Sequence, residues 1–194
     1  MTVVDTDRID MADISDELTL DEMFEWLEPT PEGFKVEIVE GTVHMSPQRD
    51  THWEIIRRIV RALEDRFGMD VRALSDVRID FGEGNGFAPD VVKLFDQAAK
   101  DSRGRWLPEH IEFVGEVISK GTAAADYGPK KDAYAAAGVP VFLIVDPYTG
   151  RCLLHSEPKD GGYHKKLVVD FGLDIDMSDT SMDLVLKTDS FPRD

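Results

Sequence analysis

Two nearly continuous apolar runs, separated by one helical segment, constrain the fold of this chain more than any other feature. The runs cover residues 112–118 and 141–145 and are rich in β-branched side chains, as expected of strands buried on both faces of a sheet. The segment over residues 126–137 is predicted to be a helix that ends at Gly138. If the two strands are parallel neighbours, the crossover through this helix should be right-handed.

The rest of the chain supplies elements on both sides of this unit. Before it, we expect a short helix over residues 21–27, capped by Thr19, and a hairpin over residues 34–39 and 42–45. We then expect a long helix over residues 50–67 and two strands over residues 71–81 and 91–95. After it, we expect short antiparallel strands over residues 152–155, 163–169 and 184–186. The order predicts a mixed α+β or α/β protein. We expect one domain over residues 18–194, preceded by an acidic mobile tail at residues 1–17.

Composition excludes several classes of protein. The chain has 194 residues, of which 42% are hydrophobic, and no apolar run approaches the roughly 18 residues of a membrane span. The first residues lack the basic start and apolar stretch of a signal peptide. Cys152 is the only cysteine, which excludes an internal disulfide and favours a reducing, cytoplasmic setting.

The net charge of −17 argues at first against a nucleic-acid partner, because phosphate binding needs Lys and Arg. The acidity, however, is concentrated at the two ends. Residues 1–40 hold 13 acidic and 2 basic side chains, and residues 170–194 hold 7 acidic and 2 basic ones. The segment between them has 19 acidic and 18 basic residues and is compatible with a polyanionic partner.

Two acidic residues lie at or inside apolar strands. Asp90 follows Pro89 and directly precedes an apolar run, and Glu116 lies within another. A buried carboxylate is costly unless a cation meets it. Asp90 could simply begin a strand, but the wholly apolar flanks of Glu116 favour a function. Two such carboxylates on neighbouring strands would suit Mg²⁺ or Mn²⁺ better than zinc.

Lys130 is a candidate third member of this site. Asp126 lies four residues earlier, so an ordinary surface ion pair on one helical face would also explain both residues. Pro129 places Lys130 in the first helical turn, where a cation opposes the helix dipole, which favours a functional purpose. Lys131 and Lys120 are alternative lysines. His52, near the start of the long helix, could support the site or lie at the surface.

Several short motifs together resemble one protein family. Each is weak alone, but their order and spacing are specific, and the resemblance runs from about Leu18 to about Val169. The motifs are Glu37-Ile38-Val39-Glu40-Gly41, Met45-Ser46-Pro47 with His52, Pro89-Asp90-Val91-Val92, Glu116-Val117-Ile118-Ser119, Asp126 with Lys130 and Tyr134, Ala137-Gly138-Val139-Pro140, and Leu143-Ile144-Val145-Asp146-Pro147. In this series the chain resembles the Uma2 family (DUF820) of the PD-(D/E)xK nuclease superfamily.

The resemblance implies a restriction-endonuclease-like core, a central mixed sheet flanked by helices. It implies that Asp90 and Glu116 bind a divalent metal, Mg²⁺ or Mn²⁺, and that Glu37 contributes, although Glu40 competes for that match. The superfamily usually places its lysine two residues after the second acid, where this chain has Ile118. Lys130 matches the family's lysine by its spacing to Tyr134.

The function implied is that of a metal-dependent endonuclease that hydrolyses nucleic-acid phosphodiester bonds, with DNA as the expected partner and a possible homodimer. The alternative is a non-catalytic module of the same fold that binds a protein or nucleic acid. The acidic ends of the chain favour a protein partner, because they would repel DNA at low salt.

Overall fold

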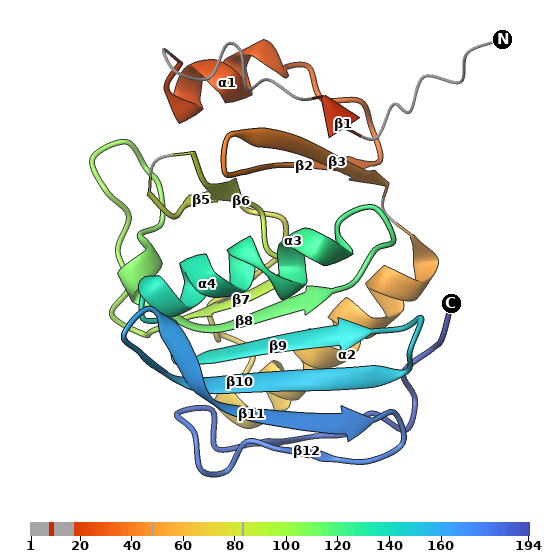
Figure 1. Ribbon diagram of the computed structural model, residues 1–194. Helices are drawn as coiled ribbons and strands as arrows, with labels where there is room; N and C mark the ends of the chain where they lie inside the picture. The colour runs from red at the N-terminus through yellow and green to blue at the C-terminus, as the bar shows by residue number, and fades with distance from the viewer. Residues whose placement is uncertain (1–7, 10–17, 48, 83) are drawn as a thin grey trace, which may run out of the picture.

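The structure of the protein, a computed structural model, describes residues 8–9, 18–47, 49–82 and 84–194 (Figure 1). Most of the expected acidic tail, residues 1–17, lies outside the described residues. Its described part, Arg8–Ile9, forms strand β1, which pairs with a strand of the expected hairpin.

A mixed six-stranded sheet forms the centre of the molecule, with strand order β11-β10-β9-β8-β7-β4. The two apolar runs form β8 and β9, which are parallel neighbours, and every other pair in this sheet is antiparallel. The strands are β4 (Ala73–Leu74), β7 (Val91–Leu94), β8 (Ile111–Val117), β9 (Val141–Asp146), β10 (Arg151–Lys159) and β11 (Gly162–Asp170).

A smaller antiparallel sheet lies above the central one in Figure 1, with strand order β1-β3-β2-β6-β5. Its main part is the predicted hairpin, in which the turn at Glu40–Gly41 joins two strands. The strands after β1 are β2 (Phe34–Val39), β3 (Thr42–Pro47), β5 (Ile79–Asp80) and β6 (Gly86–Phe87). Two further short strands, β12 (Ile175–Asp176) and β13 (Val185–Leu186), pair with each other.

Helices cover both faces of the central sheet. The helices are α1 (Leu20–Trp26), α2 (Asp50–Phe67), α3 (Ala123–Tyr127) and α4 (Pro129–Ala136), with a 3₁₀ turn at Pro108–His110. As Figure 1 shows, α3 and α4 lie on one face of the sheet and α2 lies behind it. Thr19 and Glu22 form a capping box at the start of α1, as the sequence suggested for Thr19. No helix among the described residues is long and apolar enough to cross a membrane.

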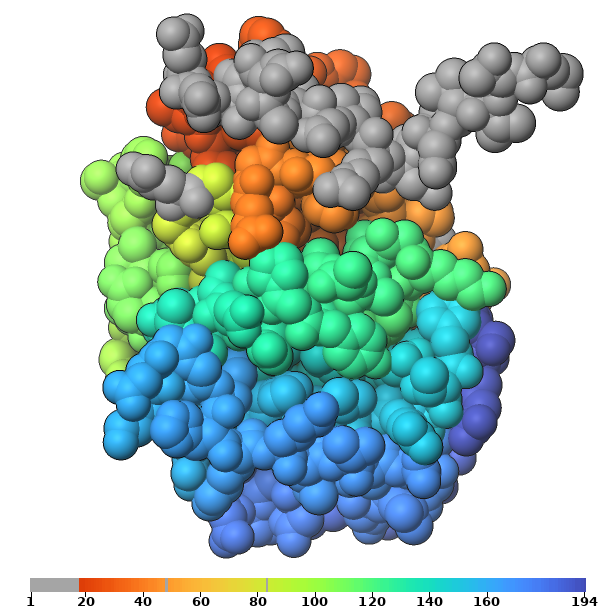
Figure 2. All heavy atoms as spheres, viewed as in Figure 1, coloured from red at the N-terminus to blue at the C-terminus, as the bar shows by residue number. Residues whose placement is uncertain are grey.

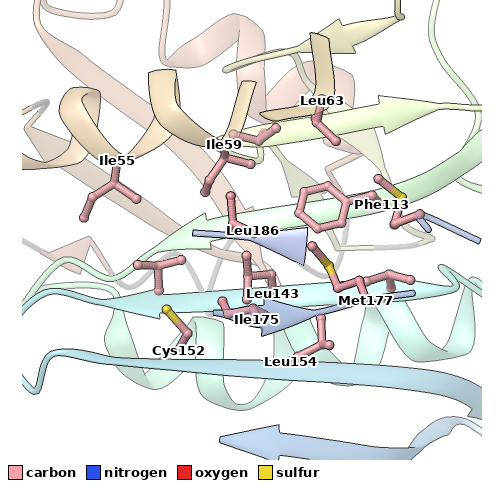
Figure 3. Close-up of a cluster of buried hydrophobic side chains, with 14 of the residues drawn as sticks. Ile55, Ile59, Leu63, Phe113, Leu143, Cys152, Leu154, Ile175, Met177 and Leu186 are labelled. Carbon is pink, nitrogen blue, oxygen red and sulfur yellow. The ribbon is translucent and has the colours of Figure 1, made fainter. Parts of the chain in front are cut away.

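Successive side chains along the central strands point to opposite faces of the sheet, so each face has its own apolar core. On one face, strand residues such as Phe113 and Leu143 pack against Ile55, Ile59 and Leu63 of α2 and against the β12–β13 segment (Figure 3). On the other face, strand residues such as Val114 and Phe142 pack against α3 and α4. Because side chains alternate along β8, Glu116 shares the second face with Val114 and is directed toward α4.

Two expected elements are wrong in detail. The strand expected over residues 71–81 is two short strands in different sheets, since β4 pairs with β7 and β5 pairs with β6. The helix expected over residues 126–137 is interrupted at Gly128, where α3 ends and α4 begins. A Cβ at Gly128 would lie 3.0 Å from the Ala124 carbonyl oxygen, so this tight junction favours glycine.

Candidate active site

The two predicted metal ligands are neighbours in the central sheet. Asp90 directly precedes β7, and the pairing of Val91 with Gly115 places it beside Glu116 of β8. The Asp90 N–H donates to Glu116 Oε2 at 3.3 Å, and the Val117 N–H donates to Asp90 Oδ2 at 2.7 Å. Both carboxylates are buried. The sheet therefore fixes the pair through backbone hydrogen bonds.

Glu37 reaches the same place from the smaller sheet. It lies on β2, whose Ile38 pairs with Gly86 of β6 and so brings the hairpin against the segment that leads to Asp90. Glu37 Oε1 accepts a hydrogen bond from the Ala88 N–H at 2.9 Å. The competing residue Glu40 is exposed in the turn after β2. The geometry places Glu37, and not Glu40, in the cluster.

Lys130 binds three carboxylates at once. Its Nζ lies 2.5 Å from Glu116 Oε1, 3.0 Å from Glu37 Oε1 and 2.9 Å from Asp126 Oδ1. The side chain is 1% exposed, so the reading of Lys130 and Asp126 as a surface ion pair is wrong. The junction at Gly128 also places the two residues on different helices, α3 and α4. Figure 2 shows α3 and α4 directly against β2 and β3 on this face of the molecule.

The other two lysines that the sequence allowed lie elsewhere. Lys131 pairs with Asp132 at 3.1 Å, and Lys120 lies over the ring of Tyr148.

Tyr134 completes the contacts of Glu116. Its hydroxyl donates to Glu116 Oε1 at 2.6 Å, and its fully buried ring packs edge-on against Phe81 and Phe87. Tyr134 lies one helical turn after Lys130, so the two side chains reach Glu116 from the same face of α4. Lys130 and Tyr134, whose spacing supported the family resemblance, therefore share Glu116 as a partner.

Lys35 is a member of the cluster that sequence reasoning missed. Its Nζ lies 2.7 Å from Asp90 Oδ1 and 3.7 Å from both Glu116 Oε2 and Glu37 Oε2. Lys35 and Glu37 are two residues apart on β2, so they share one face of the strand. This spacing of two residues was the sequence signal that could have identified Lys35 as a neighbour of Glu37.

Burial and the neighbouring carboxylates shift the pKa values of the two lysines in opposite directions. Burial alone would lower the pKa of Lys35, but Asp90, Glu37 and Glu116 outweigh it and raise the pKa. The pKa of Lys130 is raised for the same kind of reason, chiefly by Asp126. Both lysines are therefore held as ammonium ions.

The carboxyl groups respond differently to the same surroundings. Burial raises the pKa of Asp90, although Lys35 opposes the shift, and burial raises the pKa of Asp126 to about 7. At Glu116, burial is outweighed by Lys130 and Lys35, and the pKa is lowered. Of these three carboxyl groups, Glu116 is the one whose surroundings favour the anion.

A cavity of about 230 Å³ opens onto one side of the cluster. Asp90, Glu116, Asp126 and Lys35 line it, together with His52 and Trp53 of α2. Lys130 is not among the lining residues. Burial lowers the pKa of His52, which is buried rather than at the surface. The cluster thus has an inner lysine, Lys130, and a lysine on the cavity side, Lys35.

The donor set fits a divalent metal ion by its chemistry and charge. No three His, Cys, Asp or Glu side chains of the described residues are grouped so as to hold a metal ion as they stand. A cation, the Lys35 ammonium, already lies between Asp90 and Glu116. When all groups are ionised, the cluster has two net negative charges, because four carboxylates face two ammonium groups: Glu37, Asp90, Glu116 and Asp126 against Lys35 and Lys130. Mg²⁺ and Mn²⁺ prefer such oxygen ligands and commonly use only one or two carboxylates with water.

Comparisons with known proteins identify the fold and the family of the chain. No curated protein is detectably similar in sequence. Among solved structures, the chain is similar to "a putative nuclease belonging to DUF820" from Anabaena variabilis ATCC 29413, with 17% sequence identity and a TM-score of 0.69. The match covers 90% of this chain and 97% of that one, and at this identity it shows the shared fold. Residues 20–187 match the family Uma2, described as "Putative restriction endonuclease", and the chain belongs to this family.

Proposed function

We propose that this protein is a metal-dependent endonuclease that hydrolyses nucleic-acid phosphodiester bonds, most naturally those of DNA. One observation carries the proposal: Glu37, Asp90, Glu116 and Lys130, which lie far apart in the sequence, meet in one buried cluster beside a cavity. Membership of a family described as "Putative restriction endonuclease" supports the same reaction class.

Asp90 and Glu116 are the proposed metal ligands, because they are adjacent and line the cavity. A bound Mg²⁺ or Mn²⁺ would supply an activated water and neutralise charge on the phosphate. The backbone contacts of Asp90 and Glu116 keep their carboxylates in place before any ligand arrives. Such pre-organisation lowers the cost of assembling the site.

The two lysines have separate proposed roles. A lysine in a site of this kind can orient the attacking water or stabilise the transition state. Its contacts support a role exerted through Glu37 and Glu116, which it holds in position. Lys35 lines the cavity and would contact a substrate phosphate once a metal ion takes over its place beside Asp90. Replacing Lys35 with Gln should therefore reduce cleavage while Mn²⁺ binding is kept.

Cleavage of a panel of DNA and RNA substrates with Mn²⁺ tests the proposal. Asp90→Asn and Glu116→Gln should abolish cleavage and weaken Mn²⁺ binding measured by calorimetric titration. The matched control is Asp96→Asn, which changes an exposed carboxylate just beyond β7 and should leave both measurements unchanged. Full activity of the Asp90→Asn protein would refute the proposal. A wild-type protein that binds no metal would favour the non-catalytic module instead.

A further inference from the structure

A groove along the second half of α2 differs in charge from the rest of the molecule. It has a volume of about 590 Å³ and lies between α2 and residues 183–190 of the C-terminal segment. Five cationic and two acidic side chains line it: Arg57, Arg58, Arg61, Arg66 and Lys187 against Asp65 and Asp183. The lining therefore has three net positive charges in a chain whose net charge is −17.

Other cavities of the molecule have the opposite charge. The cavity at the acidic cluster is lined by two cationic and four acidic side chains, and a cavity beside β11 by two lysines and three acids. The described residues that line a further cavity beside α4 include three acids and neither lysine nor arginine. The positive groove is thus a local feature of an acidic surface, and it fits an anionic partner.

Two of the arginines hold the walls of the groove together. Arg58 donates a hydrogen bond to Ser190 Oγ at 3.1 Å, and Arg66 donates to the carbonyl oxygen of Asp183 at 2.6 Å. Both contacts fasten the C-terminal segment to α2. The groove is therefore a fixed surface with cations already in place, and it does not need to be assembled when a ligand arrives.

The acids of α2 compensate the other arginines only in part. Glu54 is the ion-pair partner of both Arg57 and Arg58, so one carboxylate serves two guanidinium groups. The Arg57 side chain is 50% exposed, which weakens its pair with Glu54. A phosphate could replace this carboxylate at Arg57 at small cost, because exposed ion pairs contribute about 0–1 kcal/mol.

Arg61 and Lys187 are the most available cations of the groove. The Arg61 side chain is 77% exposed, and its guanidinium lies 3.9 Å from Asp65, the longest reach of an ion pair. Lys187 is exposed and has no ion-pair partner in the described part of the chain. These two residues line the groove from opposite walls, one on α2 and one on the C-terminal segment.

The groove follows the cavity of the acidic cluster along α2. Arg49 and Trp53 line that cavity, and Arg57 and Arg61 line the groove. The four residues are spaced by four positions, so they lie along one face of the helix. At 1.5 Å per residue they span about 18 Å. One strand of a duplex has a phosphate about every 3.4 Å along the axis, so this length matches about five nucleotides.

We propose that this groove binds the sugar-phosphate backbone of a DNA strand that extends from the active-site cavity, with Arg57, Arg61 and Lys187 as the phosphate contacts. The inference rests on the proposed function for the identity of the polyanion, and it assigns the surface that holds the substrate beyond the cleavage site. Contacts of this kind fix the position of a strand without reading its bases.

Binding of a labelled twenty-base-pair DNA duplex, measured by fluorescence anisotropy in EDTA over a range of salt concentrations, tests the inference. The logarithm of the binding constant should fall linearly with the logarithm of the salt concentration. Combining Arg61→Gln with Lys187→Gln should reduce the magnitude of this slope by about 1.8, since each phosphate contact contributes about 0.9. Asp65→Asn should tighten binding several-fold at low salt, a gain that a misfolded protein could not show.

Matched controls remove the same charges elsewhere. Lys165→Gln on β11, Arg103→Gln in the loop before the 3₁₀ turn and Asp132→Asn on α4 each change an exposed side chain and should bind like wild type. Equal slopes for wild type and the double variant, equal changes in the controls, or a wild type that binds no duplex would each overturn the inference. Equally tight binding of a poly-glutamate peptide of matched charge would overturn the assignment to DNA. Because EDTA prevents metal-dependent cleavage, a failure of the proposed nuclease activity would leave these binding results unchanged.

Discussion

Replacing Lys130 with Met should strongly destabilise the protein, because three buried carboxylates lose a shared cation. Removing one partner of a buried ion pair typically costs about 3–5 kcal/mol. Asp126 offsets part of the loss, since its pKa is about 7 even with Lys130 present and it would take up a proton without the lysine. Lys35 remains 3.7 Å from Glu37 and Glu116. We therefore expect the lower end, a loss of about 3 kcal/mol at pH 7.

Urea denaturation followed by circular dichroism measures this loss. With an m-value of about 2 kcal/mol/M, 3 kcal/mol corresponds to a midpoint lowered by about 1.5 M. The loss should grow with pH, by up to about 1.4 kcal/mol per unit for each carboxyl group whose pKa is raised by removal of the lysine. Such a group stabilises the folded state at low pH, and the stabilisation is lost as the pH rises through its folded-state pKa.

Lys131→Met is the matched control, one residue away on α4. Lys131 is partly exposed and pairs only with the exposed Asp132 among the described contacts, so its replacement should change stability by less than about 0.5 kcal/mol. A Lys130→Met protein within about 1 kcal/mol of this control at pH 7 would refute the view that Lys130 neutralises the cluster.

Three further predictions concern stability and reactivity. Tyr134→Phe removes the hydroxyl 2.6 Å from Glu116 and should cost about 1.5–3 kcal/mol, again measured with urea; no loss would mean that the hydrogen bond is not formed. Burial lowers the pKa of His155 to about 4, so its stabilisation is present above about pH 6.5 and is lost as the pH falls toward 4, by up to about 3 kcal/mol. His155→Gln should show a correspondingly flatter stability profile between pH 7 and 4. Burial raises the pKa of Cys152 to about 12, so a thiol reagent at pH 8 should label it only in the unfolded protein, and rapid labelling of the native protein would contradict the structure.

The parts of the fold with strong local signals could be predicted from sequence. The long helix has the expected bounds, because its apolar period extends over five turns and Gly68 ends it. The segment over residues 71–81 was mispredicted because alternation reveals a strand but not the sheet to which it belongs. Here the chain leaves the central sheet after β4 and enters the smaller one at β5. The interruption at Gly128 has a local signal, the Gly128-Pro129 pair, because glycine suits the end of one helix and proline the first position of the next.

The site was predictable where a charge interrupts an apolar run. Glu116 stands out in this way, but Glu112 lies in the same run and pairs instead with Lys93. Local sequence did not separate these two acids. Lys35 is near the start of a strand in which apolar and charged residues alternate, and its partner Asp90 is 55 residues away. Only the pairing of β2 with β6, a long-range event, brings them together.

The cluster draws its charges from both sheets, with Lys35 and Glu37 on β2 and Asp90 and Glu116 at the central sheet. The ions proposed to serve catalysis therefore also hold the two sheets of the molecule together. Selection for a stable fold would act on these residues even without selection for a reaction. A relative that lacked the proposed activity would still be under pressure to keep the same acids and lysines.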